Sequence, residues 1–174
     1  ADRGPQGVKV YIGYDQAEDE AYRVAASSLY QTSGIIAEAL DASRLSAFGL
    51  YRRTIDMRGQ MYDLPSNAPC STEFAITRFL VPMLCQSGYA LFTDCDVVFL
   101  SDVHDMLRHA DPDYAVTVVK HFHDGGESNK MGGMAQTRYK RKNWSSVILF
   151  NCDHPANQRL SLDAINNRPG RDLH

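Results

Sequence analysis

Residues 89–100 read YALFTDCDVVFL, and this stretch decides the class of fold. The run Tyr89–Thr93 is rich in apolar and aromatic residues, which is typical of a buried strand. The acidic turn Asp94-Cys95-Asp96 follows directly, and a second apolar run, Val97–Leu100, is predicted as a further strand. Two carboxylates one residue apart at the end of a buried strand are costly without a cation beside them. The stretch therefore predicts a sheet that carries an acidic site at one edge.

Strands and helices are predicted to alternate on both sides of this stretch. Val8–Ile12 is predicted as a first strand, and Asp15 as the cap of a helix that runs to Gln31. A helix beginning at Ser71 or Thr72 carries Arg78 on its buried side and is expected to end or kink at Pro82. The other predicted elements are strands at 35–40, 114–119 and 146–150 and a short helix at 102–109. This alternation predicts an α/β sandwich with a mainly parallel central sheet.

Length and composition limit the class of protein. The chain has 174 residues, of which 44% are hydrophobic and 22% charged, as in one globular domain. We expect residues 1–7 to be a flexible leader and residues 8–174 to form a single domain. The formal net charge of −3 argues against a nucleic-acid partner. No apolar run approaches the roughly 18 residues of a membrane span. The four cysteines form no C-x-x-C pair, which favours free thiols and a cytoplasmic location.

The acidic turn is suited to a hard divalent cation. Mg²⁺ and Mn²⁺ prefer oxygen ligands and typically share one or two protein carboxylates with substrate phosphates. In open α/β sheets, ligands bind outside the carboxyl ends of the strands, where Asp94 and Asp96 are predicted to lie. Neither a G-x-G-x-x-G nor a P-loop occurs in the sequence, which argues against the common dinucleotide and nucleoside-triphosphate sites.

Three segments resemble the core of the family-eight glycosyltransferases and their bacterial relatives. The segments are STEFAITRFLVPML (71–84), GYALFTDCDVVFLSDVHDML (88–107) and RKNWSSVILFNCDHP (141–155). In that family a helix with an arginine precedes a strand that ends in D-x-D. The resemblance implies a GT-A fold, the nucleotide-diphospho-sugar transferase sandwich, which binds a nucleotide-sugar donor with Mn²⁺ or Mg²⁺.

The resemblance also implies roles for individual residues. Asp94 and Asp96 would be metal ligands, and Arg78 would approach the pyrophosphate and the donor sugar. The uridine-binding edge would comprise Ile12, Gly13, Tyr14 and Asp15. The sugar or acceptor side would be lined by Asn143, Ser145 and Ser146.

Each of these roles has a structural alternative. Arg78 could simply pair with Glu73 or Asp94, and Asp15 could be only a helix cap. Asn143 and the two serines could merely satisfy the start of a strand. His121, His123 and Asp124 could form a separate metal cluster. The Gly- and Met-rich stretch 124–136 is predicted to be a lid over the pocket or a surface loop.

The expected function is transfer of a hexose from a UDP-sugar to a hydroxyl acceptor, a carbohydrate or another alcohol. The family commonly supplies a third metal ligand, a histidine, from a later segment. His174 does not fit that pattern, so we expect the domain to be incomplete at its C-terminus. A non-catalytic nucleotide-sugar binding module is the alternative. A nucleotidyltransferase is disfavoured because no Gly-rich, basic phosphate loop occurs near the N-terminus.

Overall fold

A central sheet of five strands organises the protein, whose computed structural model describes residues 7–120 and 144–173. The strand order is β2-β1-β6-β8-β7. β1 pairs in parallel with β2 and with β6, whereas β8 is antiparallel to both β6 and β7. Four of the five strands therefore run in one direction, which confirms the predicted α/β class with a mainly parallel sheet. The strands are β1 (Lys9–Tyr14), β2 (Glu38–Asp41), β6 (Tyr89–Thr93), β7 (Val116–Val118) and β8 (Val147–Asn151).

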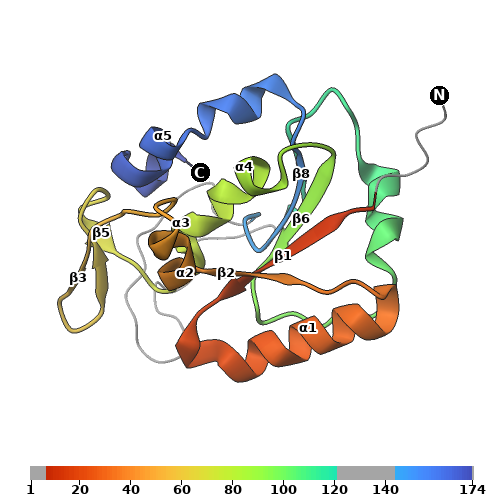
Figure 1. Cartoon of the computed structure of the whole chain (residues 1–174), viewed down its shortest axis with the longest axis horizontal. Coiled ribbons are helices and arrows are strands. Elements are labelled where there is room, and N and C mark those ends of the chain that lie inside the picture. Colours follow the sequence, from red (N-terminus) through yellow and green to blue (C-terminus); the bar gives the residue numbers. More distant parts are fainter. Residues whose placement is uncertain (1–6, 121–143, 174) are drawn as a thin grey trace.

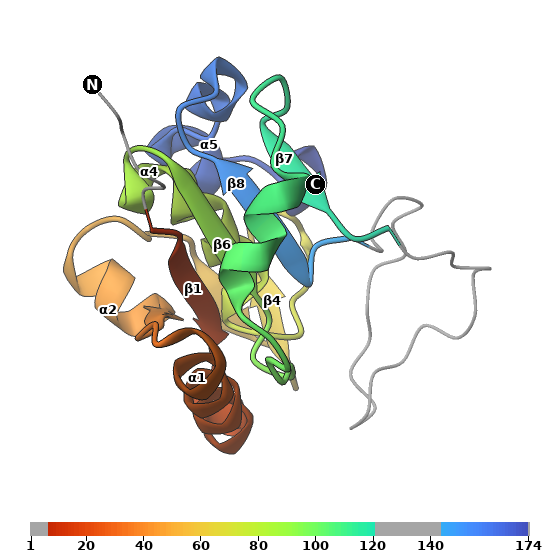
Figure 2. The ribbon, with the colours of Figure 1, turned by 90° about the vertical axis from the view of Figure 1, so that its right-hand side faces the viewer.

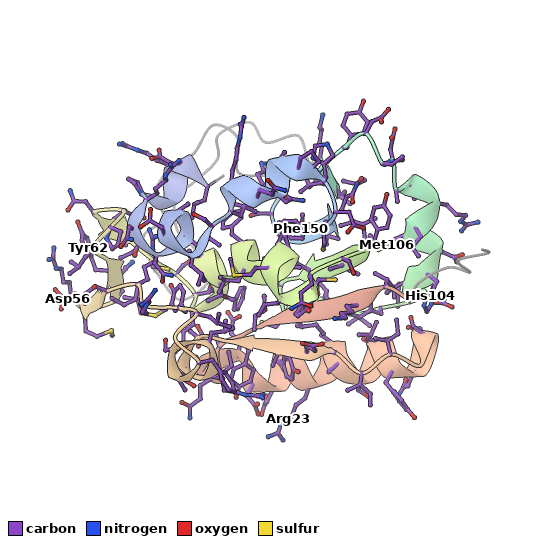
Figure 3. All side chains as sticks on the ribbon, turned by 45° about the horizontal axis from the view of Figure 1, so that its top comes forward. Arg23, Asp56, Tyr62, His104, Met106 and Phe150 are labelled. Carbon is purple, nitrogen blue, oxygen red and sulfur yellow. The ribbon has the colours of Figure 1, made fainter. Side chains whose placement is uncertain are left out.

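Helices cover the sheet on both sides. The first is α1 (Asp19–Ser33), which follows a 3-10 turn, η1 (Gln16–Glu18). Figures 1 and 2 show the sheet between α1 on one side and α4 and α5 on the other. In Figure 3 Phe150 lies inside the molecule, where it is almost fully buried, and Arg23 projects outward from α1. The helices on the side opposite α1 are α3 (Phe74–Thr77), η2 (Arg78–Leu80), α4 (Val81–Cys85) and α5 (Leu162–Asn167).

The helix predicted from Ser71 or Thr72 is present but is interrupted. Its middle turn, η2, is a 3-10 helix, and Pro82 lies at the beginning of α4. Proline is tolerated in the first turn of a helix, where its missing N–H has no partner to lose. The interruption thus lies just before Pro82, and α4 continues through Pro82 to Cys85, so the helix does not end at the proline as predicted. Arg78 lies in the interrupting turn and is buried.

Residues 41–69, for which the sequence predicted no elements, form a short helix and a small antiparallel sheet. These elements are α2 (Ala42–Ala47), β3 (Ile55–Met57), β4 (Met61–Asp63) and β5 (Ala68–Pro69). Figure 1 shows β3 and β5 beyond the end toward which β1 runs. Arg53 anchors this region through two bonds to Asp63, Nε–Oδ1 at 2.7 Å and Nη2–Oδ2 at 2.6 Å. Its Nη1 also donates to the carbonyl of Ile165 in α5, so one buried cation joins the small sheet to the C-terminal helix.

Two sequence predictions are wrong in the part after the acidic turn. Val97–Leu100 is not a strand, and Val98 and Leu100 are 58% and 88% exposed. The Phe99 amide donates to the Ser28 hydroxyl on α1 at 3.0 Å, so this segment runs along a helix. The strand predicted at 114–119 exists as β7, but it is the partly exposed edge of the sheet rather than a buried strand. Between them lies η3 (Val103–His109), which matches the predicted short helix.

The four cysteines are free thiols, as the sequence predicted. Cys85 and Cys152 nevertheless share a side-chain hydrogen bond where α4 and β8 end. That bond lowers the pKa of the Cys85 thiol to about 7 against the opposing effect of burial. No helix in the described part of the chain is long and apolar enough to cross a membrane. The remaining short helices are η4 (Pro155–Arg159) and η5 (Gly170–Asp172).

Candidate functional site

The candidate site lies at the edge of the sheet where β1 and β6 end. These strands are direct neighbours, and the register pairs Ile12 with Thr93, so the residues that follow each strand emerge side by side. β8 runs the other way, so its beginning lies at the same edge. The Asp94 amide donates to the Ser146 carbonyl at 2.9 Å and ties the acidic turn to the start of β8.

The three residues of the acidic turn differ in exposure. Asp96 is exposed and Asp94 is half-buried, whereas Cys95 between them is fully buried. The Cys95 thiol donates to Glu18 Oε2 at 2.9 Å. Burial and this bond to Glu18 both raise the pKa of the Cys95 thiol, so it remains a protonated donor at neutral pH.

Arg78 lies beneath the acidic turn, with its side chain only 6% exposed. Its Nη2 is 3.2 Å from Asp94 Oδ1, its Nη1 donates to the Ser145 carbonyl at 2.6 Å, and its Nε donates to the Phe74 carbonyl at 3.3 Å. The guanidinium also lies 4.8 Å from the centre of the Phe92 ring. Burial lowers the pKa of Arg78 and Asp94 opposes that effect, but a guanidinium remains charged in proteins. Arg78 therefore supplies a fixed positive charge directly behind Asp94.

Gly13 permits the close packing of this arginine. A Cβ atom at Gly13 would lie 2.5 Å from Cγ and Cδ2 of Phe74, far inside van der Waals contact. The absent side chain thus lets the Phe74 ring lie over the end of β1. Phe74 in turn accepts a hydrogen bond from Arg78, so the backbone of β1 and the arginine are coupled through one aromatic residue.

We expect Gly13→Ala to destabilise the protein by about 1–3 kcal/mol, because the added methyl group must displace the Phe74 ring. Urea unfolding measures the change. Gly7→Ala is the matched control, since nothing lies within 4 Å of a Cβ built at Gly7. The double change Gly13→Ala with Phe74→Leu should be less destabilising than the sum of the single changes. A Gly13→Ala protein as stable as Gly7→Ala would contradict this account.

Asp15 joins two elements at the end of β1. Its Oδ1 accepts from the Ala17 amide at 3.0 Å, so it caps the 3-10 turn η1 rather than the long helix α1 for which the sequence predicted it. Its Oδ2 accepts from the Glu73 amide at 3.1 Å, at the beginning of α3. A carboxylate has about four acceptor positions, so Asp15 can serve as this double cap and still accept a further hydrogen bond. Burial raises the pKa of the Glu73 carboxyl above its usual range, and the nearby negative charge of Asp15 raises it further.

The other residues of the predicted nucleotide edge differ in exposure. Ile12 is buried in the core, so only its backbone can reach a ligand. Tyr14 is half-buried, donates from its hydroxyl to Asp19 Oδ1 at 3.2 Å and meets Tyr22 edge-on. Ser145 is buried and uses its carbonyl to hold Arg78, whereas Ser146 is exposed. The structure thus brings Ser145 and Ser146 to the acidic turn through their backbone carbonyls.

Several predicted features lie outside the described residues. These are Asn143, the proposed cluster of His121, His123 and Asp124, and the predicted lid at 124–136. The described part of the site is therefore built from β1, α3, η2, β6 and the residues at the beginning of β8.

The donor set of the acidic turn fits a divalent cation that is shared with a ligand. Asp94 and Asp96 offer hard carboxylate oxygens, and Asp96 faces solvent. Within residues 7–120 and 144–173, no three His, Cys, Asp or Glu side chains gather as a metal site would require. Two carboxylates suit Mg²⁺ or Mn²⁺ only when phosphate oxygens or water complete the shell. The two carboxylates therefore suit a hard cation whose remaining ligands come from outside the acidic turn.

Sequence reasoning missed the supporting role of Glu18 and Cys95. The cysteine pattern predicted a free thiol at Cys95, but the hydrogen bond of this buried thiol to Glu18 was not predicted. The two residues are 77 positions apart, and no local pattern indicates that they meet. The only available signal was the placement of Glu18 three residues after the cap Asp15, close to the end of β1.

Comparisons with known proteins relate this geometry to a known fold. No protein-family model matches the chain. The sequence is 40% identical over 169 residues to Protein CDI of Arabidopsis thaliana, a match that covers 95% of this chain and 61% of that protein. The chain thus spans less than two thirds of the length of this curated relative.

Solved structures share the arrangement of the backbone. The apo structure of the bifunctional glycosyltransferase WbbM superposes with a TM-score of 0.55 and 12% identity, over 95% of this chain and 35% of that one. Mouse xyloside xylosyltransferase 1 in its apo form superposes with a TM-score of 0.52 and 12% identity, over 97% of this chain and 80% of that one. The chain has a GT-A-like fold. This GT-A-like sheet ends in the acidic turn at the edge where open α/β sheets bind their ligands.

Proposed function

We propose that this chain forms the nucleotide-sugar site of a metal-dependent glycosyltransferase, which moves a hexose from a UDP-sugar to a hydroxyl acceptor. One observation carries the proposal: the adjacent parallel strands β1 and β6 end side by side, with Asp94 and Asp96 backed by the buried Arg78. The GT-A-like fold supports it, because the two structures of similar fold are glycosyltransferases.

Each part of the site has a role in this proposal. Asp94 and Asp96 would hold Mn²⁺ or Mg²⁺, which neutralises charge on the departing diphosphate. The backbone of Ile12 and Gly13, together with Tyr14 and Asp15, would receive the uridine. Arg78 would offset the charge of Asp94 and keep that carboxylate in place. Ser145 and Ser146, with Asn143 outside the described residues, would line the sugar or acceptor side.

The reaction replaces one bond at the anomeric carbon. The acceptor's hydroxyl oxygen forms a bond to that carbon, and its proton passes to the departing diphosphate or to water. The bond from the carbon to the diphosphate oxygen breaks, and UDP leaves with the bonding electron pair. What this chain contributes is an ordered acidic edge that binds the diphosphate before and after transfer.

Calorimetric titration tests the donor site. UDP and UDP-glucose are titrated into the protein with and without Mn²⁺, and the titration is repeated with Asp96→Asn. We expect wild type to bind UDP only weakly without Mn²⁺, and Asp96→Asn to lose about tenfold or more of the Mn²⁺-dependent affinity. Asp113→Asn is the matched control, because Asp113 is exposed and precedes β7 at the opposite edge of the sheet. Metal-independent binding, or equal binding by both variants, would refute the proposed metal site.

A nucleotide-sugar binding module without turnover is the second candidate. The exposed Asp96 and the half-buried Asp94 could hold a metal and a nucleotide-sugar whether or not transfer follows. Release of UDP from UDP-glucose in the presence of Mn²⁺ separates the candidates. A transferase releases UDP slowly into water, whereas a binding module releases none. Release of pyrophosphate from UTP and a sugar phosphate would instead indicate a nucleotidyltransferase.

A further inference from the structure

The middle residue of the acidic turn faces away from the proposed ligand. Cys95 is fully buried, and its thiol donates to Glu18 Oε2 at 2.9 Å. Glu18 is the last residue of η1, the turn that connects β1 to α1. The bond therefore fastens the turn after β6 to the turn after β1, and these two turns form the proposed binding edge.

This bond closes a ring of contacts around the site. The Glu18 amide donates to the Asp15 carbonyl at 2.9 Å, and the Asp15 carboxylate receives the Glu73 amide at 3.1 Å. α3 begins at the next residue and leads into Arg78, whose Nη2 is 3.2 Å from Asp94. Cys95 follows Asp94 and returns the chain of contacts to Glu18. Three segments meet in this ring: the one after β1, the one before Arg78 and the one after β6. Each segment is thus held by the other two.

The acidic turn has little regular structure to hold it in place. It belongs to no helix or strand, and its backbone is tied to β8 through the Asp94 amide. An unordered turn would have to lose conformational freedom when a ligand binds, which weakens binding. Residues that orient metal ligands from behind commonly change metal affinity by about 10–100-fold when they are replaced.

We propose that Glu18 and Cys95 are positioning residues, whose thiol–carboxylate bond holds the acidic turn in the conformation that presents Asp94 and Asp96. The consequence for ligand affinity rests on the proposed function; the ordering of the turn does not. The Cys95 thiol is fully buried, so the bond exerts its effect through the two aspartates on either side of Cys95.

Four variants separate the effect of the hydrogen bond from the effect of the volume that the Cys95 side chain fills. Cys95→Val keeps an apolar side chain of similar size and removes the donor, whereas Cys95→Ser retains a donor. Glu18→Ala removes the acceptor from a side chain that is only partly buried, and so tests the bond even if Cys95→Val does not fold. Cys85→Val is the matched control for loss of a buried thiol elsewhere, since Cys85 donates to the Ser87 carbonyl.

Amide hydrogen exchange is measured first, without any ligand. We expect exchange in the peptide that contains residues 94–96 to become about tenfold faster in Cys95→Val and Glu18→Ala. Cys95→Ser and Cys85→Val should exchange there like wild type. Wild-type exchange in Cys95→Val and Glu18→Ala would overturn the proposal. An equal acceleration in Cys95→Ser would also overturn it, because shape rather than the hydrogen bond would then order the turn.

Titration with UDP and Mn²⁺ on the same proteins measures the consequence. We expect a loss of affinity of about 10–100-fold in Cys95→Val and Glu18→Ala, with rescue by Cys95→Ser. The double variant should lose no more than the larger single loss, because both changes remove one bond. If wild type itself fails to bind UDP with Mn²⁺, the proposed function fails, while the exchange data still decide whether the bond orders the turn.

Discussion

Replacement of Arg78 by methionine should lower the free energy of unfolding by about 2–4 kcal/mol, since it removes the cation of a largely buried ion pair. The carbonyls of Ser145 and Phe74 would lose their donor at the same time. Asp94 retains some contact with water, its side chain being 20% exposed, so the loss should fall below that of a fully buried pair. The affinity for UDP with Mn²⁺ should also decrease, because Asp94 would no longer be held from behind.

Urea unfolding followed by tryptophan fluorescence measures this loss directly. Trp144 is the sole tryptophan of the chain, and it packs against the core next to Ser145, whose carbonyl receives Arg78. Arg23→Met provides the control, since Arg23 forms an exposed i,i+4 pair with Asp19 on α1. Exposed pairs contribute little, so this variant should unfold close to wild type. Equal stability of the two variants would show that the buried pair has no special role.

Replacement of Arg53 by methionine should lower the free energy of unfolding further, by about 3–5 kcal/mol. The side chains of Arg53 and Asp63 are 0% and 4% exposed, so the lone carboxylate left behind has almost no access to water. The Ile165 carbonyl and the Ser66 hydroxyl would also lose their bonds to the guanidinium. α5 would thereby lose one of its attachments to the segment before the small sheet.

The comparison with Arg58→Met isolates the effect of burial. Arg58 and Asp56 form an exposed pair in the same small sheet, with an Nε–Oδ2 distance of 2.9 Å. We expect Arg58→Met to match wild type in urea unfolding. Hydrogen exchange in α5 should become faster in Arg53→Met alone. An unchanged rate of hydrogen exchange in α5 would mean that the bonds of Asn166 to Leu50 and Arg52 suffice to hold this helix.

The strands of the fold could be predicted from the sequence because buried strands have continuous apolar runs. Tyr89–Thr93 matches β6 residue for residue, and Val8–Ile12 lies largely within β1. The antiparallel direction of β8 could not be predicted, because its apolar run is the same in either direction. The strand predicted at Val97–Leu100 failed for a related reason. A short apolar run that packs along a helix has the same sequence pattern as a strand that pairs in a sheet. Only the tertiary contacts of the run distinguish the two.

The site could be predicted in part. The pairing of Arg78 with Asp94 was one of the alternatives that the sequence left open, and the structure shows it. The buried pair of Arg53 and Asp63 could not be predicted, because charged residues are seldom buried and neither lies in an apolar run. Whether Asp94 and Asp96 bind a metal, and whether Ile12 to Asp15 receive uridine, stay predictions for the titrations described above.

The pairing of β1 with β6 also governs the order in which a newly made chain can fold. Lys9 pairs with Ala90, which lies far along the chain, so one edge of β1 stays open until β6 has left the ribosome. Sheets built from such distant pairings form slowly, and an open apolar edge is prone to pair with other chains in the meantime. The acidic edge needs still more of the chain, because the carbonyls that hold Arg78 and Asp94 come from Ser145 and Ser146. The acidic edge can therefore become ordered only after residue 146 and the β8 strand that follows it have been made.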